Sequence, residues 1–413
     1  MAEVCPVASA DGGAAPTGRR IKVLYVCTAL DRGSGGEKHS LTLAKHLDRS
    51  RFDFAVCVIE RASESATLEL ERSDCPLYSL NLSRRLYNPF GSMRILYRLY
   101  QLFSKIRPDV VQSHALHANL FARPAAKWAG VRSIISTENV LPDVERNPLR
   151  RALNVPLHAL NSQLDRSTQQ IVVTSEVVRR WKDPGGKSRK VCVIAPPFDL
   201  DRFTATRAHG PRSHREAGDR TAVLGVVGRL SREKGHRFLI AAMPEILARE
   251  PEAQLLIVGA GPLESELRAE VEALDLSKRV RFLGHVQDVE RTLSLLDVLV
   301  VPSLSEAFSL ATVEGMMMEL PIVGSRTGGI AEIVLDGETG LLVPPGDSAA
   351  LARGCQYLLS NPDVRWQMGE RGRRRVLDAF HPAQFIARHE QLYATAAGDD
   401  PCGTVGVASR SCP

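Results

Sequence analysis

The first half of the chain is a series of short apolar runs separated by polar loops and by segments with helical periodicity. Residues 21–27 form a nearly continuous apolar run, which is typical of a central strand in a parallel sheet. Helices are expected from about residue 37 and over residues 90–105. A helical stretch over 147–166 contains Pro156, which favours a kink or a break there. Further strands are expected at 52–59, 75–80, 109–113, 132–137, 171–174 and 191–195.

The second half repeats this alternation of strand, loop and helix. Residues 295–301 are an apolar run ended by Pro302 and Ser303. A polar loop separates this run from a helix expected over 309–319, with Ser309 as its N-cap. Alternation of this kind indicates an α/β protein. The other expected strands are 222–227, 254–258, 280–283 and 321–325, and the later helices are 330–335, 348–359, 362–380 and 382–394.

The helix expected over 309–319 carries two carboxylates in different settings. On a helical wheel Glu314 falls beside the apolar stripe, whereas Glu319 falls on the opposite side and is expected to face water. A carboxylate beside an apolar stripe needs a partner, because an unpaired buried charge costs several kcal/mol, roughly. Glu306 lies beyond the carboxyl end of a strand, where open α/β sheets bind ligands. Spacing alone leaves open that Glu314 pairs with a structural arginine and that Glu306 is merely solvated. The apolar stripe consists of Leu310, Val313, Met317 and Leu320.

Length and composition limit the class of protein. With 413 residues and 44% hydrophobic content, the chain can form two globular domains of roughly 180–200 residues. A net charge of +6 and a pI near 8.9 suit an anionic small molecule or an acidic membrane surface and do not indicate nucleic acid. The eight cysteines form no Cys-x-x-Cys pair, and Cys27, Cys57 and Cys192 fall in apolar strands, which favours a reducing compartment. Residues 1–20 lack the apolar segment of a signal peptide, so a cytoplasmic location is expected.

The helix expected over 90–105 is both apolar and basic. Arg94, Arg98, Gln101 and Lys105 form one polar stripe along it. A basic amphipathic helix is a candidate for peripheral contact with anionic lipid on the inner face of a membrane. The alternative is a core helix with a solvated basic stripe. Its apolar residues are Met93, Leu96, Tyr97, Leu99, Tyr100, Leu102 and Phe103.

Two loops have the character of anion sites. Gly35 and Gly36 lie between a strand and a helix, where free amides and the helix dipole favour an anion, although the glycines alone could simply make a tight turn. Arg229, Arg232 and Lys234 crowd the start of another helix, where the dipole disfavours cations by a few tenths of a kcal/mol, roughly. An anion held between them would remove this conflict. The alternative is a solvated basic loop.

Several linked motifs follow one another in the second half of the chain. They are Gly-Arg-Leu-Ser-Arg-Glu-Lys-Gly at 228–235, Ser-Glu-Ala-Phe-Ser-Leu-Ala-Thr-Val-Glu-Gly-Met at 305–316, Leu-Pro-Ile-Val-Gly-Ser at 320–325, Gly-Gly-Ile-Ala-Glu-Ile-Val at 328–334 and Gly-Leu-Leu-Val-Pro-Pro-Gly-Asp at 340–347. In this order they resemble the signature of the retaining family 4 nucleotide-sugar glycosyltransferases, which have the GT-B architecture. The resemblance covers about residues 20–395 and is densest over 225–345.

The resemblance implies a donor site on the second half. Glu314 matches the residue that binds the ribose hydroxyls of the nucleotide, and Glu306 matches the residue that faces the donor sugar. The backbone amides of Phe308, Ser309 and Leu310 match those that reach the phosphate or the sugar.

Further donor contacts are implied around the first strand of the second half. Arg229 and Lys234, which follow Gly228, match the two cations that grip the donor diphosphate. The segment containing Gly284 and Val286 resembles one whose backbone contacts the base.

The first half contributes two more matches. Gly35 and Gly36 stand where the family has a glycine loop that closes over the donor phosphates. His114 ends a Pro-Asp-Val-Val-Gln-Ser-His segment and matches a histidine that borders the donor sugar, whereas a lone histidine would usually be structural. The chain departs from the family pattern in four places: at Glu138 and Asn139 on the acceptor side, at the Pro196-Pro197 pair of the hinge, at Gly315 where alanine is usual, and at Met317-Met318-Glu319, which replaces a small-residue segment ending in glycine.

The implied reaction is retaining transfer of a hexosyl-type sugar from a nucleoside-diphosphate sugar to a glycan or lipid-linked acceptor. Arg229 and Lys234 would neutralise the leaving diphosphate, with Glu306 and His114 positioning the sugar, so neither a metal nor another cofactor is expected. The Asp199-Leu-Asp201 segment has a metal-binding form but falls at the hinge. Two alternatives stay open: a sugar-nucleotide epimerase of GT-B architecture, and a non-catalytic GT-B binding scaffold.

The expected fold is α/β and GT-B, with two Rossmann-like, doubly wound domains facing across a cleft and a C-terminal helix crossing back to the first domain. In chain order we expect a disordered tail, an acceptor-side domain, a hinge and linker, a donor-binding domain, the returning helix and a second disordered tail. Their boundaries are 1–19, 20–197, 198–220, 221–379, 380–397 and 398–413.

Overall fold

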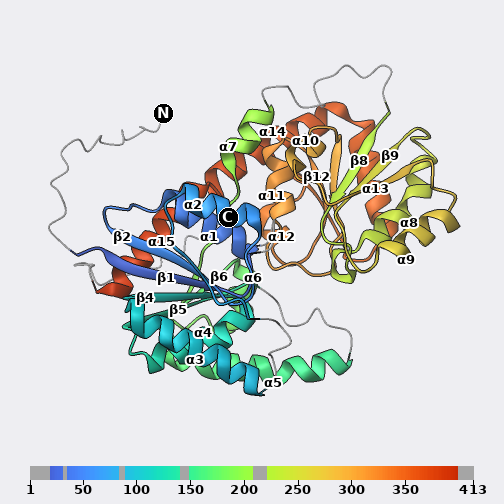
Figure 1. Cartoon of the computed structure of the whole chain (residues 1–413). Coiled ribbons are helices and arrows are strands. Elements are labelled where there is room, and N and C mark those ends of the chain that lie inside the picture. The colour runs from blue at the N-terminus through green and yellow to red at the C-terminus, as the bar shows by residue number, and fades with distance from the viewer. Residues whose placement is uncertain (1–18, 31–34, 83–88, 140–147, 208–220, 399–413) are drawn as a thin grey trace, which may run out of the picture.

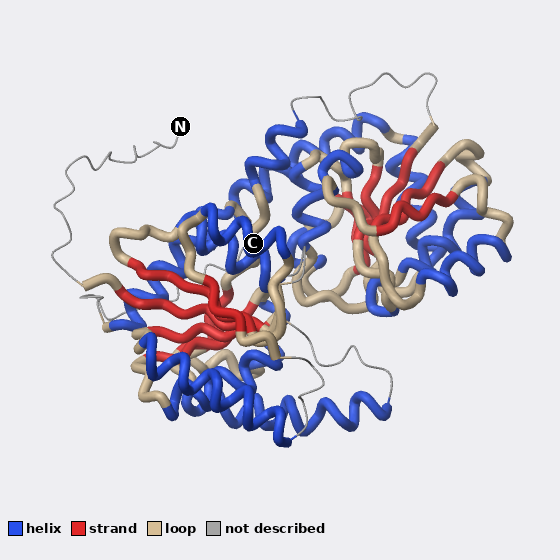
Figure 2. The backbone as a smooth tube through the Cα atoms, in the orientation of Figure 1, coloured by secondary structure: helices blue, strands red, loops and turns tan. Residues whose placement is uncertain are grey.

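The computed structural model describes residues 19–30, 35–82, 89–139, 148–207 and 221–398, which form two lobes side by side (Figure 1). Each lobe has a parallel sheet covered by helices, as Figure 2 shows. The sheet formed by the strands β1 to β7 defines the N-terminal lobe, and the sheet formed by β8 to β13 defines the C-terminal lobe. The α/β class and the two Rossmann-like units are therefore confirmed, while the domain limits given above stay predictions.

In the described residues the N-terminal sheet has seven parallel strands in the order β3-β2-β1-β4-β5-β6-β7. The strand order reverses between β1 and β4, where Cys27 is the register partner of His114. The switch point of this lobe therefore lies at these two carboxyl ends. The strands are β1 Ile21–Cys27, β2 Phe52–Val58, β3 Leu77–Ser79, β4 Val110–His114, β5 Ser133–Glu138, β6 Gln170–Val173 and β7 Val191–Val193. The helices are α1 Gly35–His46, α2 Glu64–Arg72, α3 Pro89–Ile106, α4 Ala115–Trp128, α5 Pro148–Leu164, the 3₁₀ turn η3 Asp165–Ser167 and α6 Glu176–Lys182.

The C-terminal sheet has six parallel strands, among the described residues, in the order β10-β9-β8-β11-β12-β13. Its switch point lies between β8 and β11. The strands are β8 Val223–Val227, β9 Gln254–Val258, β10 Val280–Gly284, β11 Val298–Val301, β12 Ile322–Ser325 and β13 Gly340–Val343. The helical elements are η5 Arg232–Lys234, α8 His236–Leu247, α9 Glu264–Ala273, α10 Val289–Leu293, α11 Leu310–Met317, α12 Ile330–Ile333, α13 Ser348–Ser360 and α14 Pro362–Ala379.

The structure departs from the expected elements most clearly in three places. The strand expected from residue 295 begins only at Val298, because the preceding residues form a turn after α10. Helix α5 continues through Pro156 without a break. Part of the expected linker is helix α7 Leu200–Arg207, whose Phe203 is buried against Phe198 in the C-terminal core. The rest of the linker, residues 208–220, and almost all of the two expected tails lie outside the described residues.

Glu319 was expected to face water, and this prediction is wrong. Its residue is only 4% exposed and lies just past α11 in the left-handed region, with φ 58°. Helix α14 covers this side: a Cβ added at Gly369 would lie 2.0 Å from the carbonyl oxygen of Glu319. A helical wheel shows one apolar stripe, but α11 is covered by a second layer of helix as well as by the sheet.

Helix α15, Pro382–Ala397, crosses back to the N-terminal lobe as predicted, and Figure 1 shows it beside β1 and β2. Its Phe385 and Tyr393 belong to the core of that lobe. The Tyr393 hydroxyl donates to Oε1 of Gln112, whose Nε2 donates to His389 Nε2 at 3.4 Å and to Thr137 Oγ1 at 2.8 Å. This chain of hydrogen bonds fixes the helix to β4 and β5.

Candidate active site

A cavity of about 260 Å³ lies at the carboxyl ends of β8 and β11. This is the switch point of the C-terminal sheet, where open α/β sheets bind their ligands. Side chains of both charges and backbone from the ends of the two strands surround it. The lining residues are Lys38, Val226, Val227, Gly228, Arg229, Lys234, His236, Val301, Pro302, Ser303, Glu306, Phe308, Ser309, Leu310 and Ala311.

Lys234 and Glu306 form an ion pair in this cavity. Lys234 Nζ lies 2.6 Å from Glu306 Oε2, which also accepts a hydrogen bond from Ser303 Oγ at 3.3 Å. Gly235, with φ 67°, makes the turn that brings Lys234 here, and a Cβ added to it would lie 2.0 Å from the carbonyl oxygen of Pro302. The turn therefore needs glycine both for its left-handed backbone and for its close contact with the end of β11.

Arg229 lines the cavity, but its guanidinium is paired with a carboxylate of its own loop. Its side chain is 68% exposed, and it donates to Glu233 Oε1 at 2.8 Å. Burial raises the pKa of Glu233, but hydrogen bonds from Ser231 and Arg229 outweigh burial and hold that pKa below its usual value. Arg232, the third cation of the cluster, is exposed and does not line the cavity.

The loop that carries Glu306 is held by close backbone packing. A Cβ added at Gly328, where φ is 48°, would lie 1.8 Å from the Glu306 carbonyl oxygen, and Gly329 N donates to that oxygen at 2.9 Å. Ser309 is the N-cap of α11, as predicted, because its Oγ accepts from Thr312 N at 3.3 Å. The structure therefore brings Phe308, Ser309 and Leu310 to the cavity together with Glu306, and the lining residues listed above include all three.

Glu314 has a partner that the sequence did not reveal. It is 6% exposed on α11, and its Oε1 lies 2.7 Å from Lys38 Nζ. Lys38 belongs to α1 of the N-terminal lobe, two residues after Gly36, so this ion pair joins the two lobes. The sequence left open a structural arginine as the partner of Glu314, and the partner in the structure is instead a lysine from the opposite lobe.

The lobes also touch beside Glu306. Ser175 Oγ donates to the carbonyl oxygen of Ala307 at 2.5 Å. The carboxylate of Glu332, on α12, accepts from the amides of Glu176 and Val177 at 2.9 and 2.5 Å. Negative charge is favourable at these free amides, which open helix α6. Hydrogen bonds between side chains and backbone therefore hold the two lobes together next to the cavity.

His114 is the last residue of β4 and lies outside the cavity lining. It is 3% exposed, and burial followed by the charge of His389 lowers its pKa to about 4. Asn139 Nδ2 lies 3.1 Å from Nε2, so Nε2 accepts and Nδ1 donates to the Tyr25 hydroxyl at 2.7 Å. A Cβ added at Gly36 would lie 3.6 Å from the His114 ring, so the first turn of α1 contacts this histidine while its Lys38 reaches Glu314.

Of the remaining predicted residues, Gly228 lines the cavity, whereas Gly35, Gly284 and Val286 do not. Gly35 begins α1, and Gly228 is hydrogen-bonded to β9 through its amide. Gly284 ends β10 with φ 65°, and its carbonyl oxygen accepts from Gly259 N at 2.8 Å. Neither Gly284 nor Val286 is among the described residues that line the cavity. Their expected contact with a base stays a prediction.

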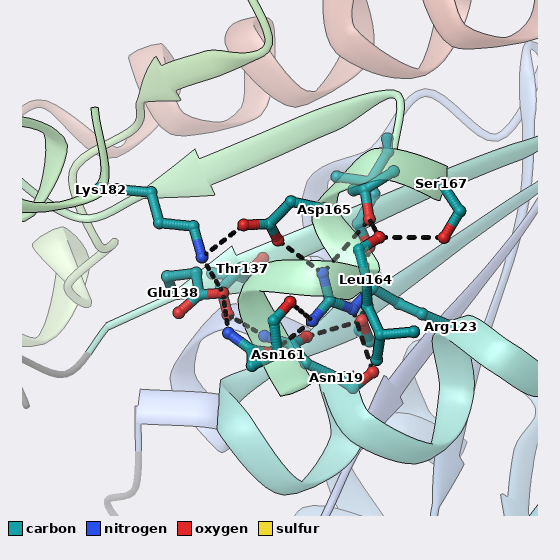
Figure 3. Close-up of polar contacts among 12 residues, drawn as sticks. Asn119, Arg123, Thr137, Glu138, Asn161, Leu164, Asp165, Ser167 and Lys182 are labelled. Atoms are coloured by element: carbon teal, nitrogen blue, oxygen red, sulfur yellow. Dashed lines mark hydrogen bonds and ion pairs between the residues drawn. The ribbon is translucent and has the colours of Figure 1, made fainter. Parts of the chain in front are cut away.

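Glu138 ends β5 within a buried network of charges (Figure 3). Its Oε1 accepts from Asn161 Nδ2 at 2.7 Å and lies 3.1 Å from Lys182 Nζ. Lys182 also reaches Asp165 at 2.9 Å, and the fully buried Arg123 lies 2.8 Å from the same carboxylate. The charges of Arg123 and Lys182 thus neutralise those of Glu138 and Asp165. These contacts join α4, α5 and α6 to the end of β5. The Glu138 departure therefore has a structural role in this chain.

Other features bear on metals and membranes. In the part of the chain that the structure describes, no group of three or more His, Cys, Asp or Glu side chains is arranged to hold a metal ion. Asp199 accepts a hydrogen bond from Arg202 N at the start of α7. No helix among the described residues combines the length and the apolar character needed to cross a bilayer.

Two family models match this chain, one on each half. A model described as "Glycosyl transferase 4-like domain" matches residues 34–197, and one described as "Glycosyl transferases group 1" matches residues 221–361. The second match contains all the C-terminal residues of the cavity described above.

Similar proteins agree with these matches. A D-inositol 3-phosphate glycosyltransferase of Corynebacterium jeikeium is 38% identical over 190 residues, which are 43% of this chain and 45% of that protein. An N-acetyl-alpha-D-glucosaminyl L-malate synthase of Bacillus anthracis is 33% identical over 159 residues, 38% of this chain and 42% of that protein. The matched segments thus span less than half of each relative. The structure of Anabaena Alr3699/HepE in complex with UDP-glucose has a TM-score of 0.74 at 19% identity, covering 91% of this chain and all of that one. By its two family matches, its relatives and its fold, the chain belongs to the GT-B glycosyltransferases of the GT4 type.

Proposed function

We propose that this protein transfers a hexosyl-type sugar from a nucleoside-diphosphate sugar to a glycan or lipid-linked acceptor, with retention of anomeric configuration. The observation that carries the proposal is the switch-point cavity in which Lys234 faces Glu306, with Arg229 at its rim. Proteins with this fold have been crystallised with UDP and UDP-glucose, which supports a nucleotide-sugar donor.

The chemical task is to break the bond between an anomeric carbon and a diphosphate. Negative charge then grows on the departing phosphate, and the sugar becomes oxocarbenium-like. Lys234, Arg229 and the amides at the start of α11 supply positive charge in place of a metal ion. In this proposal Glu306, which is bonded to Lys234 and Ser303, faces the sugar, and Glu314 accepts hydrogen bonds from the ribose.

Residues of the N-terminal lobe complete the proposed site on the side opposite the C-terminal sheet. Because Lys38 is paired with Glu314, a bound ribose must share or replace that contact. His114 is neutral at neutral pH and adds no charge beside the sugar, which could bond to its ring only by replacing Asn139 at Nε2. Packing of the N-terminal lobe over the donor would exclude water and limit hydrolysis.

Binding of UDP-glucose, GDP-mannose and ADP-glucose, measured by calorimetry, tests the proposal. We expect one of them to bind with micromolar affinity, and Glu314→Gln to weaken its binding about tenfold, since a hydrogen bond to a charged group is worth about 1.5–3 kcal/mol. Glu338→Gln, on the exposed turn before β13, is the control and should leave affinity unchanged.

Product analysis separates the alternatives. An epimerase would release a free sugar or an isomer without any acceptor, and a non-catalytic scaffold would show no turnover of a donor it binds. Either result would contradict the transferase proposal. Transfer with inversion would contradict only the retaining part.

Helix α3 favours a membrane-associated acceptor. Four large apolar side chains are exposed at positions spaced as one face of the helix, and Phe90 is the most exposed, at 86%. The opposite face is buried in the core of the N-terminal lobe. Arg94 and Arg98 lie exposed beside the apolar face, and the helix has no acidic residue. The other exposed apolar residues are Met93, Tyr97 and Tyr100.

We therefore propose that this face of α3 lies on an anionic lipid surface. Arg94→Gln/Arg98→Gln should weaken binding to vesicles of phosphatidylglycerol about 30-fold, because each basic residue near such a surface contributes about 1 kcal/mol. Arg371→Gln/Arg374→Gln removes the same charge from exposed positions of α14 and should have no effect. Equal loss in both variants, measured by sedimentation, would show general charge attraction instead of docking through α3.

A further inference from the structure

A buried histidine without partners lines the cavity. His236 is the first residue of α8, directly after the turn that carries Lys234. It is 2% exposed, and in the described structure neither of its ring nitrogens has a hydrogen-bond partner. Its side chain is one of those that surround the cavity at the end of β8 and β11.

This arrangement is unfavourable for the protein alone. Burial, followed by the charge of Lys234, lowers the pKa of His236 to about 4, while Glu233 opposes this shift. The ring is therefore neutral at neutral pH and has one N–H donor and one acceptor. Leaving buried polar atoms unpaired destabilises a fold, so a leucine of similar size would suit the free protein better.

The surroundings of His236 point to an anion. Lys38, Arg229 and Lys234 line the same cavity together with the carboxylate of Glu306, while the carboxylates that pair with Lys38 and Arg229 are not among its lining residues. The ring lies at the N-terminus of α8, which has no side-chain cap, so the helix dipole there also favours an anion. A ring N–H in this position would find its acceptor in an anionic ligand.

We infer that His236 is a further donor-binding residue, whose ring N–H donates a hydrogen bond to a phosphate oxygen of the nucleotide-sugar diphosphate. The inference rests on the function proposed above and adds a contact to it. The residue would act in donor binding together with Lys234, and the helix start would hold the same phosphate.

The test compares donor affinity with stability in two variants. His236→Leu should weaken binding of the tightest of UDP-glucose, GDP-mannose and ADP-glucose about tenfold, the value of one hydrogen bond to a charged group. The melting temperature of the free protein should rise by a few degrees, because two unpaired buried atoms are removed. His236→Gln keeps an N–H donor and should recover part of the affinity. If His236 only packs, His236→Leu should lower the melting temperature. Either that result or a normal donor affinity of His236→Leu would overturn the inference.

The number of protons that the protein takes up when it binds the donor gives a second test. A histidine that only packs would not change this number. A bound diphosphate favours the imidazolium, so binding should raise the pKa of His236 and strengthen as pH falls from 7 to 5.5. Nucleotide sugars suit this test because their phosphates are diesters that do not titrate in that range. The wild type should take up protons on binding at pH 5.5 and His236→Leu should take up fewer; equal uptake would contradict the contact. If the wild type binds none of the three sugars, the proposed function fails, and this inference with it.

Discussion

Lys234→Ala is expected to slow sugar transfer by about 10²–10³-fold, the usual cost of removing one preorganised group that stabilises developing charge. Lys234 lies in the cavity at the switch point, 2.6 Å from Glu306 and held there by the Gly235 turn. Its loss removes positive charge where the leaving diphosphate gains negative charge. It also frees Glu306, whose position in the site depends on this pair. Initial rates with the best donor, at saturating donor and acceptor, measure the effect.

Arg232→Ala is the matched control. Arg232 belongs to the same short turn, carries the same charge and is exposed to solvent away from the cavity lining. We expect its transfer rate to stay within about threefold of the wild type, since exposed charges contribute little. Comparable losses in the two variants would mean that general charge attracts the donor. A normal rate for Lys234→Ala would remove the account of the leaving group altogether.

Much of the fold could be predicted because local pattern and tertiary structure agree there. The strands over 21–27 and 254–258 have the predicted bounds, since each is an apolar run ended by polar or glycine residues. The Ser309 cap is correct because the signal lies in the hydrogen bond of its own side chain to the next turn. Such elements depend little on what packs around them.

The predictions that failed depend on neighbours distant in sequence. Glu319 is buried, although the helical wheel predicts exposure, because α14 covers it. The partner of Glu314 is Lys38, 276 residues away on the other lobe, and no spacing rule links the two. Helix α7 forms within the expected linker because its Phe203 finds a place in the C-terminal core.

The candidate site shows the same division. The motifs pointed to Glu306 and Lys234, which follow strand ends in the sequence and line the cavity in the structure, while their roles stay predictions. They did not reveal the ion pair between the two, nor the pairing of Arg229 with Glu233. His236 was missed although it directly follows the lysine–glycine turn, since only burial and the lack of partners make it notable.

Acid should destabilise the protein well above the range in which carboxylates titrate. Burial lowers the pKa of His114, His236 and His389 to about 4 from an ordinary value of 6.5, and lowers that of His39 further still. Below pH 6.5 the unfolded chain therefore binds protons that the folded chain does not. Each of the four histidines then contributes roughly 1.4 kcal/mol of lost stability per pH unit, about 5.5 kcal/mol together, until the pH approaches 4. Glu332, whose pKa is raised by burial, opposes this in part.

Removing one of these histidines should flatten the pH dependence even where it lowers stability. His389 donates to the Phe385 carbonyl oxygen through Nδ1 at 2.9 Å and accepts from Gln112, so His389→Phe loses two hydrogen bonds and should unfold more easily at pH 7. Its unfolding free energy, from denaturant titrations at pH 7, 6 and 5, should nevertheless fall about 1.4 kcal/mol less per pH unit than that of the wild type. His285→Gln, at an exposed position after β10, should keep the wild-type slope. If His389→Phe also keeps that slope, the acid sensitivity comes from other groups, and burial of a neutral imidazole beneath α15 is not its cause.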